Sequence, residues 1–422
     1  MIRHEHAGLE VAYLLPDPGI PVGGSKGASV HVESLCAALA RRGVDVTLYA
    51  ARVAGPMTAR GSESVRVVPI DIGHVSSGKQ ADTLRIDAAN AYFDKLERFL
   101  SFREPGCIIE RLSLFAGRGS QLAEGLGLAR LVEVNAPVAD ERKRHFGLSL
   151  EEVARQAESD ALCGARVVAV SEPLARWALD MGARTARVIP NGADVEGLDP
   201  NLLSFLAPIT RSRIGLAKST PVIGFIGSLK PWHGVDVLIE AVSRVSQTMQ
   251  VGLLIVGDGP EYGRLSESLG RLAPQATAVM TGAVQRSHVA EHIAAMDISV
   301  APYAENDSFY FSPLKVVEAM AAGRAVVASD FPPIRDLLGP AGVLVTPSDP
   351  ESLAQSLERL LAEPETRRLL GATARARAVE RSSWSGVADT VLSELAAARE
   401  KIERPGVGSA SLLTDTSDRS ST

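Results

Sequence analysis

The chain alternates short apolar runs with longer amphipathic stretches. In its first part we expect buried strands at 11–15, 44–50, 65–70, 107–110, 130–135 and 165–171. Strands that alternate with helical patterns favour a parallel sheet covered on both faces. The first part of the chain therefore predicts a doubly wound α/β domain.

This rhythm lapses near residue 195 and then restarts. Apolar runs at 221–227 and 251–257 each lead into a helical pattern, and further strand-like runs follow. The helix expected after Gly234 has its apolar residues on one face, the spacing of a core-facing helix: Val235, Leu238, Ile239 and Val242. The simplest interpretation is a second doubly wound α/β unit.

The lapse also predicts where the two domains separate. The segment 195–215 holds two prolines and little periodicity, which is typical of a linker. We therefore expect one domain over 1–203 and a second over 204–384. A helix at about 385–402 has no strand after it, and the polar residues 403–422 predict a disordered tail.

Composition narrows the class of protein. A chain of 422 residues is too long for one ordinary hydrophobic core, which predicts more than one domain. Its content of 45 % hydrophobic and 22 % charged residues is typical of globular proteins. A net charge of −6 does not indicate the basic surface that nucleic-acid-binding proteins carry. Cys36, Cys107 and Cys163 form neither a disulfide framework nor a metal pair. With no apolar stretch near the ~18 residues of a membrane span, we expect a soluble cytoplasmic protein without stable membrane insertion.

The segment FYFSPLKVVEAMAAG contains a cation where a helix disfavours one. We expect Ser312 as N-cap and Pro313 as the first helical residue, which puts Lys315 in the positively charged first turn. Glu318 lies four residues beyond Leu314, so both point back toward that end. A helix N-terminus with a lysine is typical of a phosphate site; the alternative is a solvated lysine.

Two further loops follow predicted strands at the edge where parallel sheets bind ligands. The first, GSLKPWHG, holds Gly227, Ser228, Lys230 and His233, which suits an anion near the backbone. Its alternative is an ordinary turn with a packed tryptophan. The second, GIPVGGSKGASVHVE, includes Gly24 and matches neither a Walker loop nor a GxGxxG fingerprint.

Five motifs in order resemble the retaining glycosyltransferases of family four. They are VIPNGAD (188–194), GFIGSLKPWHGVDVLIEA (224–241), LIVGDGPE (254–261), MTGAV (280–284) and SPLKVVEAMAAGRAVVAS (312–329). The resemblance covers roughly residues 10–400. It implies the GT-B fold: two Rossmann-like domains facing a cleft, a nucleotide-sugar donor held mainly by the second, and the closing helix crossing back to the first.

The resemblance also implies roles for single residues. Glu318 would bind the donor ribose, Gly282 and Val284 would lie beside the base, and Gly24 would approach the donor from the first domain. Gly227, Ser228, Ser312 and Leu314 complete the expected donor site. The chain departs from the family pattern in three places: Ser228 and His233 replace an arginine and a lysine, and Tyr310 replaces the first glutamate of E-x7-E, whose sugar contact we assign to Glu305 or Asp307.

The family's usual front-face route needs stabilisation of the leaving diphosphate more than a protein nucleophile. We assign that catalytic role to Lys230, His233 and Lys315. The chain has no strict D-x-D motif, so we expect no metal and no further cofactor.

The first domain should hold the acceptor. Glu110, Glu133 and Asn135 lie at predicted strand ends, and a carboxylate-lined pocket would suit a polyol or an amine-bearing ring. The alternative is that Glu110 pairs with its neighbour Arg111. The loop GIPVGGSKGASVHVE with EVNAP is similar to enzymes of aminoglycoside biosynthesis that transfer N-acetylglucosamine from UDP-GlcNAc to 2-deoxystreptamine. Polysaccharide and glycolipid acceptors remain alternatives.

Other function classes fit less well. An oxidoreductase should show a full GxGxxG with its acidic partner, which this chain lacks. A nucleotide-sugar epimerase of the same fold would release an isomerised nucleotide sugar. A binding protein without activity would bind the donor without turnover. The ordered motifs favour glycosyl transfer to a small polar acceptor.

Overall fold

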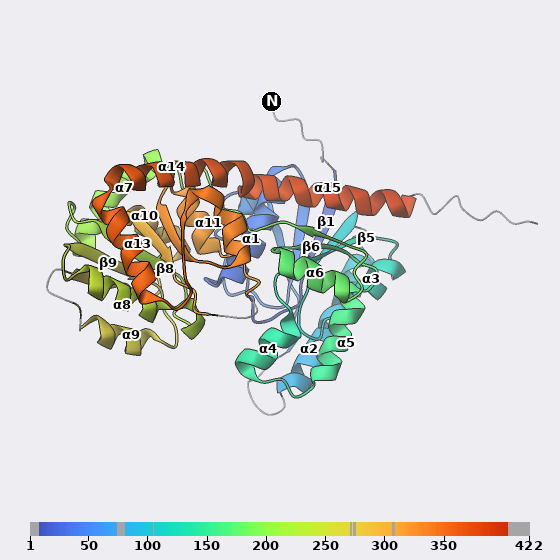
Figure 1. Ribbon diagram of the computed structural model, residues 1–422. Coiled ribbons are helices and arrows are strands. Elements are labelled where there is room, and N and C mark those ends of the chain that lie inside the picture. Colours follow the sequence, from blue (N-terminus) through green and yellow to red (C-terminus); the bar gives the residue numbers. More distant parts are fainter. Residues whose placement is uncertain are drawn as a thin grey trace, which may run out of the picture.

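Two parallel sheets form the two halves of the protein in the computed structural model (Figure 1). The structure describes residues 8–73, 81–103, 105–270, 272, 276–305 and 309–403. The strand orders are β3-β2-β1-β4-β5-β6-β7 and β10-β9-β8-β11-β12-β13. In each sheet the order reverses beside its first strand, which is the doubly wound arrangement. The predicted pair of Rossmann-like domains is confirmed.

The first sheet has short strands that are almost fully buried at its centre, as the apolar runs predict, whereas the edge strands are partly exposed. Its strands are β1 Glu10–Leu15, β2 Asp45–Ala50, β3 Arg66–Pro69, β4 Cys107–Arg111, β5 Ala129–Val134, β6 Arg166–Ala169 and β7 Thr185–Val188. The helices around it are α1 Gly27–Arg41, α2 Ala81–Leu100, α3 Gly119–Gly125, α4 Val138–Phe146, α5 Glu151–Leu162 and α6 Glu172–Asp180, with a 3-10 turn η1 at Ser62–Ser64.

The second sheet repeats the plan. Its strands are β8 Val222–Ile226, β9 Val251–Val256, β10 Ala276–Met280, β11 Ile298–Ala301, β12 Ala325–Ser329 and β13 Val343–Val345. Its helices are α7 Pro200–Arg213, α8 Val235–Val245, α9 Tyr262–Leu269, α10 Val289–Ala294, α11 Leu314–Ala321, α12 Pro332–Leu338, α13 Pro350–Ala362 and α14 Pro364–Arg381, with 3-10 turns η2 Pro231–His233, η3 Arg286–His288 and η4 Gly339–Ala341. Helix α8 buries the four apolar residues that its spacing predicts.

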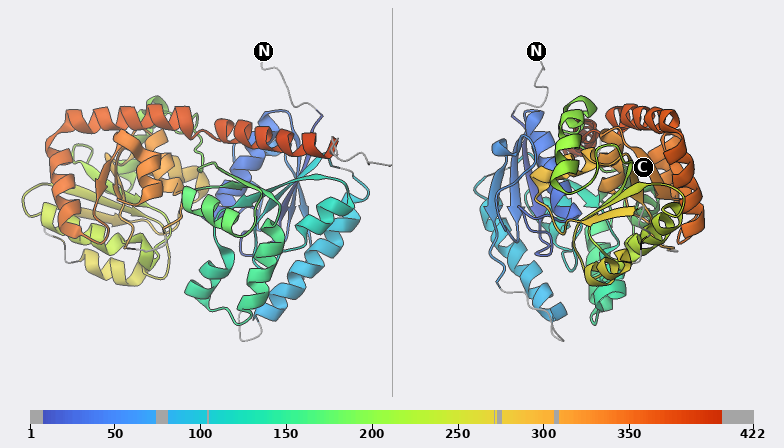
Figure 2. Two further views of the ribbon diagram at one scale, coloured as in Figure 1. Left: turned by 45° about the vertical axis from the view of Figure 1, so that its right-hand side comes forward. Right: turned by 90° about the vertical axis from the view of Figure 1, so that its left-hand side faces the viewer.

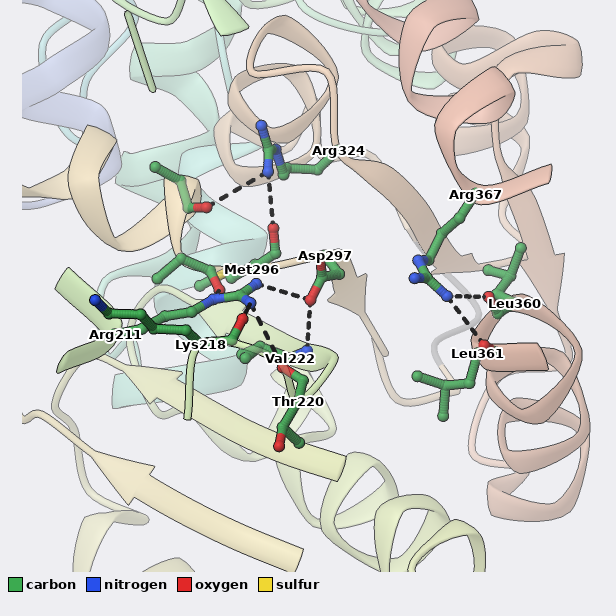
Figure 3. Close-up of polar contacts among 12 residues, drawn as sticks. Arg211, Lys218, Thr220, Val222, Met296, Asp297, Arg324, Leu360, Leu361 and Arg367 are labelled. Carbon is green, nitrogen blue, oxygen red and sulfur yellow. Dashed lines mark hydrogen bonds and ion pairs between the residues drawn. The ribbon is translucent and has the colours of Figure 1, made fainter. Parts of the chain in front are cut away.

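The segment expected to be a linker is largely helix α7, because Asp199 caps it by accepting the N–H of Asn201. Figure 3 shows the Arg211 guanidinium of α7 donating to Asp297 at 2.7 Å. Asp297 also accepts the Val222 N–H at 2.7 Å, so one carboxylate ties α7 to β8. Helix α7 therefore packs with the second sheet, although it begins before the boundary predicted at residue 203.

Helix α15, Trp384–Glu403, returns to the first domain (Figure 2). Trp384 is part of the first domain's apolar core. At the helix surface, Asp389 accepts from Arg42 at 2.6 Å, and Glu394 accepts from Arg166 at 2.6 Å. The predicted crossing helix is confirmed. The predicted disordered tail lies outside the described residues from 404 onward.

No helix among the described residues is both long enough and apolar enough to span a membrane. The expected cytoplasmic localisation therefore stays a prediction from sequence.

The carboxyl edges of the two sheets face each other across the domain boundary. A Cβ added at Gly27, at the start of α1, would lie 3.5 Å from the Leu314 side chain at the start of α11. The ring of His145 on α4 lies over that of Trp232 in η2, with centroids 4.2 Å apart. The Ser171 hydroxyl donates to the Tyr310 carbonyl at 2.7 Å. Loops that follow strands of both sheets thus line one shared cleft.

Candidate active site

The loop after β8 brings its backbone close to a cation. Gly227 has a φ of 142°, and a Cβ added there would lie 2.9 Å from the Lys315 ammonium nitrogen. Gly234 closes the same loop with a φ of 62°, a left-handed conformation that favours glycine. The two glycines thus permit a tight loop that leaves room beside Lys315.

Lys315 lies in the first turn of α11, as the sequence predicts. Its ammonium nitrogen is buried and has no hydrogen-bond partner. It sits 4.2 Å from the ring centroid of Phe225 and 5.0 Å from that of Tyr303. Burial lowers the pKa of Lys315 to about 7. A buried ammonium without an anionic partner is costly, which favours a ligand that supplies the missing negative charge.

Ser312 does not cap α11, so that prediction is wrong. Pro313 occupies the N-cap position and no side chain caps the helix. The Ser312 hydroxyl instead accepts the Asn191 N–H at 2.9 Å, and its carbonyl accepts from the Asn191 side-chain amide at 2.5 Å. The first-turn N–H groups of α11 are therefore left without a side-chain partner, as an anion site at a helix N-terminus requires.

Lys230 and His233 differ from Lys315. The Lys230 ammonium lies 5.7 Å from the ring centroid of Trp232. His233 pairs through Nδ1 with the Ser228 carbonyl at 2.5 Å. Burial, and then the charge of Lys315, lower the pKa of His233 to about 3. His233 is therefore neutral at pH 7, and the positive charge that the sequence analysis assigned to it is absent.

Glu318 is 5 % exposed and forms an ion pair with Arg286. Both line a cavity of about 270 Å³ between the domains, with Asp194 and Trp384 among its other walls. Arg286 was missed by sequence reasoning, although it stands only two residues beyond the MTGAV motif. The ribose contact expected for Glu318 stays a prediction, and in this structure one of its oxygens faces Arg286.

The other expected contacts with the donor base lie beside Arg286. Gly282 has a φ of 70°, and Val284 is a partly buried residue packed on the second domain's core. Their contact with a base stays a prediction.

Gly24 lies in a loop that leaves no room for a side chain. A Cβ added there would lie 2.7 Å from the Ser29 hydroxyl oxygen and 2.9 Å from the Pro21 carbonyl oxygen. The buried carboxylate of Glu33 holds the loop by accepting the Gly23 N–H at 2.7 Å. The loop is thus fixed at the start of α1, opposite α11.

Glu110 does not face the cleft, contrary to our expectation for an acceptor contact. It is 0 % exposed and pairs with Arg130, and a Cβ added at Gly119 of α3 would collide with its carboxylate. Burial raises the pKa of Glu110. The alternative pairing with Arg111 is also wrong, because successive residues of a strand point to opposite faces.

Glu133 lies on the other face, at the centre of a saturated network. Its carboxylate accepts from Arg111 at 3.1 Å and from the Asn135 amide at 2.5 Å, and it also contacts the Tyr13 hydroxyl and His31. Although burial opposes it, the charges of His31 and Arg111 hold the pKa of Glu133 well below its usual range. Glu133 and Asn135 therefore bind each other, which leaves the carboxylate little capacity for an acceptor.

The same network reaches the second domain. His31 Nδ1 lies 2.5 Å from the side-chain oxygen of Asn191, whose amide nitrogen donates to Ser312. His31 and Asn191 were not singled out by sequence reasoning, although both fall within quoted motifs, GIPVGGSKGASVHVE and VIPNGAD. Their pairing connects helix α1 with the loop after β7, which are distant in sequence, so no local pattern could have predicted it.

Tyr310, at the position of the family's first glutamate, packs against the first domain. Its hydroxyl forms a hydrogen bond with Glu141, and its carbonyl accepts from Ser171. The N–H of the proposed substitute Glu305 donates to the Ser348 hydroxyl at 2.9 Å. Asp307 lies outside the described residues. The sugar contact assigned to Glu305 or Asp307 therefore stays a prediction.

No group of three or more His, Cys, Asp or Glu side chains able to hold a metal ion occurs within the part of the chain that the structure describes. The metal-independent reaction expected from sequence stays a prediction.

Comparison with known proteins agrees with this arrangement. The family model described as Glycosyl transferases group 1 matches residues 220–363. A phosphatidyl-myo-inositol mannosyltransferase of Mycolicibacterium smegmatis is 34 % identical over 53 % of this chain and 55 % of its own length. A D-inositol 3-phosphate glycosyltransferase of Geodermatophilus obscurus is 28 % identical over 92 % of this chain and 88 % of its own.

A solved sucrose-phosphate synthase of Thermosynechococcus elongatus superposes with a TM-score of 0.72 at 23 % identity, covering 92 % of this chain and 100 % of that one. The chain spans about half the length of the curated relatives that it first matches. The described part of the chain therefore has the GT-B fold, and residues 220–363 match the group 1 glycosyl transferases.

Proposed function

We propose that the protein is a retaining glycosyltransferase that moves a hexosyl group from a nucleotide-diphosphate sugar to a hydroxyl of an inositol-type acceptor. The observation that carries the donor half is the buried, unpartnered ammonium of Lys315, placed beside Gly227 and the open first turn of α11. A donor diphosphate would supply the charge that this pocket lacks.

The chemistry needs few protein groups. The acceptor oxygen forms a bond to the sugar's anomeric carbon while the bond from that carbon to the diphosphate oxygen breaks. The acceptor proton passes to the leaving phosphate, and the nucleoside diphosphate departs. Lys315 and the N–H groups of α11 stabilise the charge that develops on the diphosphate. Neutral His233 accepts or donates a hydrogen bond there but adds no charge.

Two observations favour an inositol-type acceptor over 2-deoxystreptamine. The two relatives described above are named for inositol acceptors, one a phosphatidyl-myo-inositol and one an inositol 3-phosphate. In addition, Glu110 and Glu133, the carboxylates that would have attracted a cationic aminocyclitol, are paired with arginines. A cationic ring would therefore find no free carboxylate at these two positions.

The test is a transfer assay. UDP-glucose, UDP-N-acetylglucosamine and GDP-mannose are each combined with myo-inositol, inositol 3-phosphate, phosphatidylinositol vesicles or 2-deoxystreptamine, and products are identified by mass and anomeric configuration. We expect an α-linked hexosyl inositol product from one donor. Transfer only to 2-deoxystreptamine would restore the aminocyclitol interpretation. An isomerised nucleotide sugar without transfer would indicate an epimerase, and no donor binding would overturn the proposal.

A further inference from the structure

Among the lysines and arginines in the described part of the chain, buried side-chain nitrogens without a hydrogen-bond partner occur at two places. One is Lys315 Nζ at the donor edge; the others are Nε of Arg85 and Nε of Arg142, both in the first domain. The proposed donor site uses Lys315 but neither arginine. The arginine pair therefore needs an explanation of its own.

The two guanidiniums lie near each other at the carboxyl edge of the first sheet, because Arg142 is 3.8 Å from Asp82, which stands one turn before Arg85 on α2. Arg85 stands near the start of α2 and lines a narrow pocket with Asp17 and Leu114, which follow β1 and β4. Arg142 stands on α4, over the ring of Phe146 at 5.3 Å. Burial and then the charge of Arg85 lower the pKa of Arg142. Like charges held together are unfavourable unless an anion joins them.

The neighbouring carboxylates Asp82 and Asp17 offset the charge of this pair only in part. Asp82 is 3.8 Å from Arg142, and its other oxygen accepts from the N–H and hydroxyl of Ser149 at 2.6 Å each. Asp17 accepts the Gly19 N–H at 2.7 Å. Both carboxylates thus share their charge with backbone N–H groups. By contrast, Arg111 and Arg130 on the same sheet have buried glutamate partners.

One member of the pair, Arg142, also lies on the helix that contacts the donor loop. His145, one turn beyond Arg142 on α4, packs its ring on Trp232, next to Lys230. A ligand anchored by Arg142 is therefore held on the helix that contacts the second domain. Donor and acceptor groups on either side of this contact would share one cleft.

We propose that Arg85 and Arg142 bind a phosphate group of the acceptor, so that the substrate class is a phosphorylated polyol rather than a neutral or cationic one. The proposal rests on the glycosyltransferase function proposed above. The planar guanidinium fork matches phosphate geometry, and two such forks converging on one anion are typical of phosphate recognition. The phosphate is either a free monoester, as in an inositol phosphate, or the diester of a lipid headgroup.

The experiment is calorimetry on the full chain saturated with UDP. Inositol 3-phosphate and myo-inositol are titrated into wild type, Arg85→Gln, Arg142→Gln and the control Arg176→Gln, which changes an exposed arginine of α6 paired with Glu172. We expect wild type to prefer the phosphorylated probe. Each site variant should lose about tenfold or more of that affinity, while affinity for UDP and myo-inositol, and the thermal unfolding midpoint, stay unchanged. The control should match wild type.

A second arm separates the two sources of phosphate. Sedimentation of wild type and variants with phosphatidylcholine vesicles, with or without phosphatidylinositol, measures binding to the lipid headgroup. Arginine-dependent binding to vesicles but not to inositol 3-phosphate assigns the site to the diester, and the reverse assigns it to the monoester. If wild type binds neither phosphate probe better than myo-inositol or plain vesicles, or if the variants bind them as wild type does, the proposal is overturned.

UDP and UDP-sugar binding, measured in the same series, keeps the two proposals apart. Donor binding without a phosphate preference overturns only the arginine site, whereas loss of donor binding in wild type overturns the glycosyltransferase function itself. Arg142→Lys tests whether the planar guanidinium matters beyond its charge. Because it keeps the charge but removes the planar fork, we expect its affinity for the phosphorylated probe to lie between those of Arg142→Gln and wild type.

Discussion

At the carboxyl edge of the second sheet, a buried lysine ammonium lies between two aromatic rings without a partner. At the same edge of the first sheet, Glu133 is equally buried but contacts Tyr13, His31, Arg111 and Asn135. The first arrangement is complete only when a ligand arrives, and the second is complete already. Burial of a charge therefore does not by itself mark a binding residue; an unpaired buried charge does.

The Glu133 network should give the largest effect on stability. Glu133→Gln leaves Arg111 and His31 buried without their anionic partner. Breaking a buried ion pair from one side costs about 3–5 kcal/mol, and we expect that loss in the free energy of unfolding measured with urea. The control Glu196→Gln, which changes an exposed partner of Arg60, should alter stability little. A fully stable Glu133→Gln would show that the network is not structural.

Lys315 should give the largest effect on donor binding. Lys315→Ala removes a charge-assisted contact, which we expect to weaken UDP-sugar binding by about 1.5–3 kcal/mol in calorimetry. Its thermal stability should fall little, because the buried ammonium contacts two aromatic rings but has no hydrogen-bond partner in the free protein. Lys218→Ala serves as the matched control. If Lys315→Ala binds the donor as tightly as wild type does, the buried unpaired ammonium does not mark a binding site, and the contrast with Glu133 fails.

The pH dependence of donor binding tests the same contact. The pKa of Lys315 is about 7 in the free protein because of burial, and a bound diphosphate should raise it. Binding above pH 7 must then take up a proton, so affinity should fall as pH rises, by at most about tenfold per unit. Calorimetry at pH 8 in two buffers of different ionisation enthalpy counts the proton. Lys315→Ala should show no such uptake, and a wild type without uptake would mean that Lys315 binds uncharged.

The contact between the two edges should give the smallest effect. A double-mutant cycle on His145→Ala and Trp232→Ala measures the coupling between these stacked rings. We expect about 0.5–1.5 kcal/mol in the free energy of unfolding. A coupling of zero would indicate that the domains in solution do not hold the contact that brings Arg142 and the donor loop together.

Local pattern was sufficient for much of the fold. The period of apolar residues predicted every strand except β7 and also the buried face of α8. The family resemblance predicted that the unpaired final helix crosses back to the first domain. Turn chemistry misled at two places. Ser312 looks like an N-cap but binds Asn191 in another domain, and the two prolines of 195–215 suggested a linker where Asp199 starts a helix.

By itself, the sequence determined the two α/β units, the order of their elements and the position of Lys315 in the first turn of a helix, because periodicity and helix-start signals are local. Only the tertiary structure decided which buried charges have a partner of opposite charge. Glu110 finds Arg130 across two strands, and Glu133 finds His31 from another helix, whereas Lys315, Arg85 and Arg142 retain buried unpaired nitrogens. Pairing depends on distance in space, and distance in sequence does not reveal it.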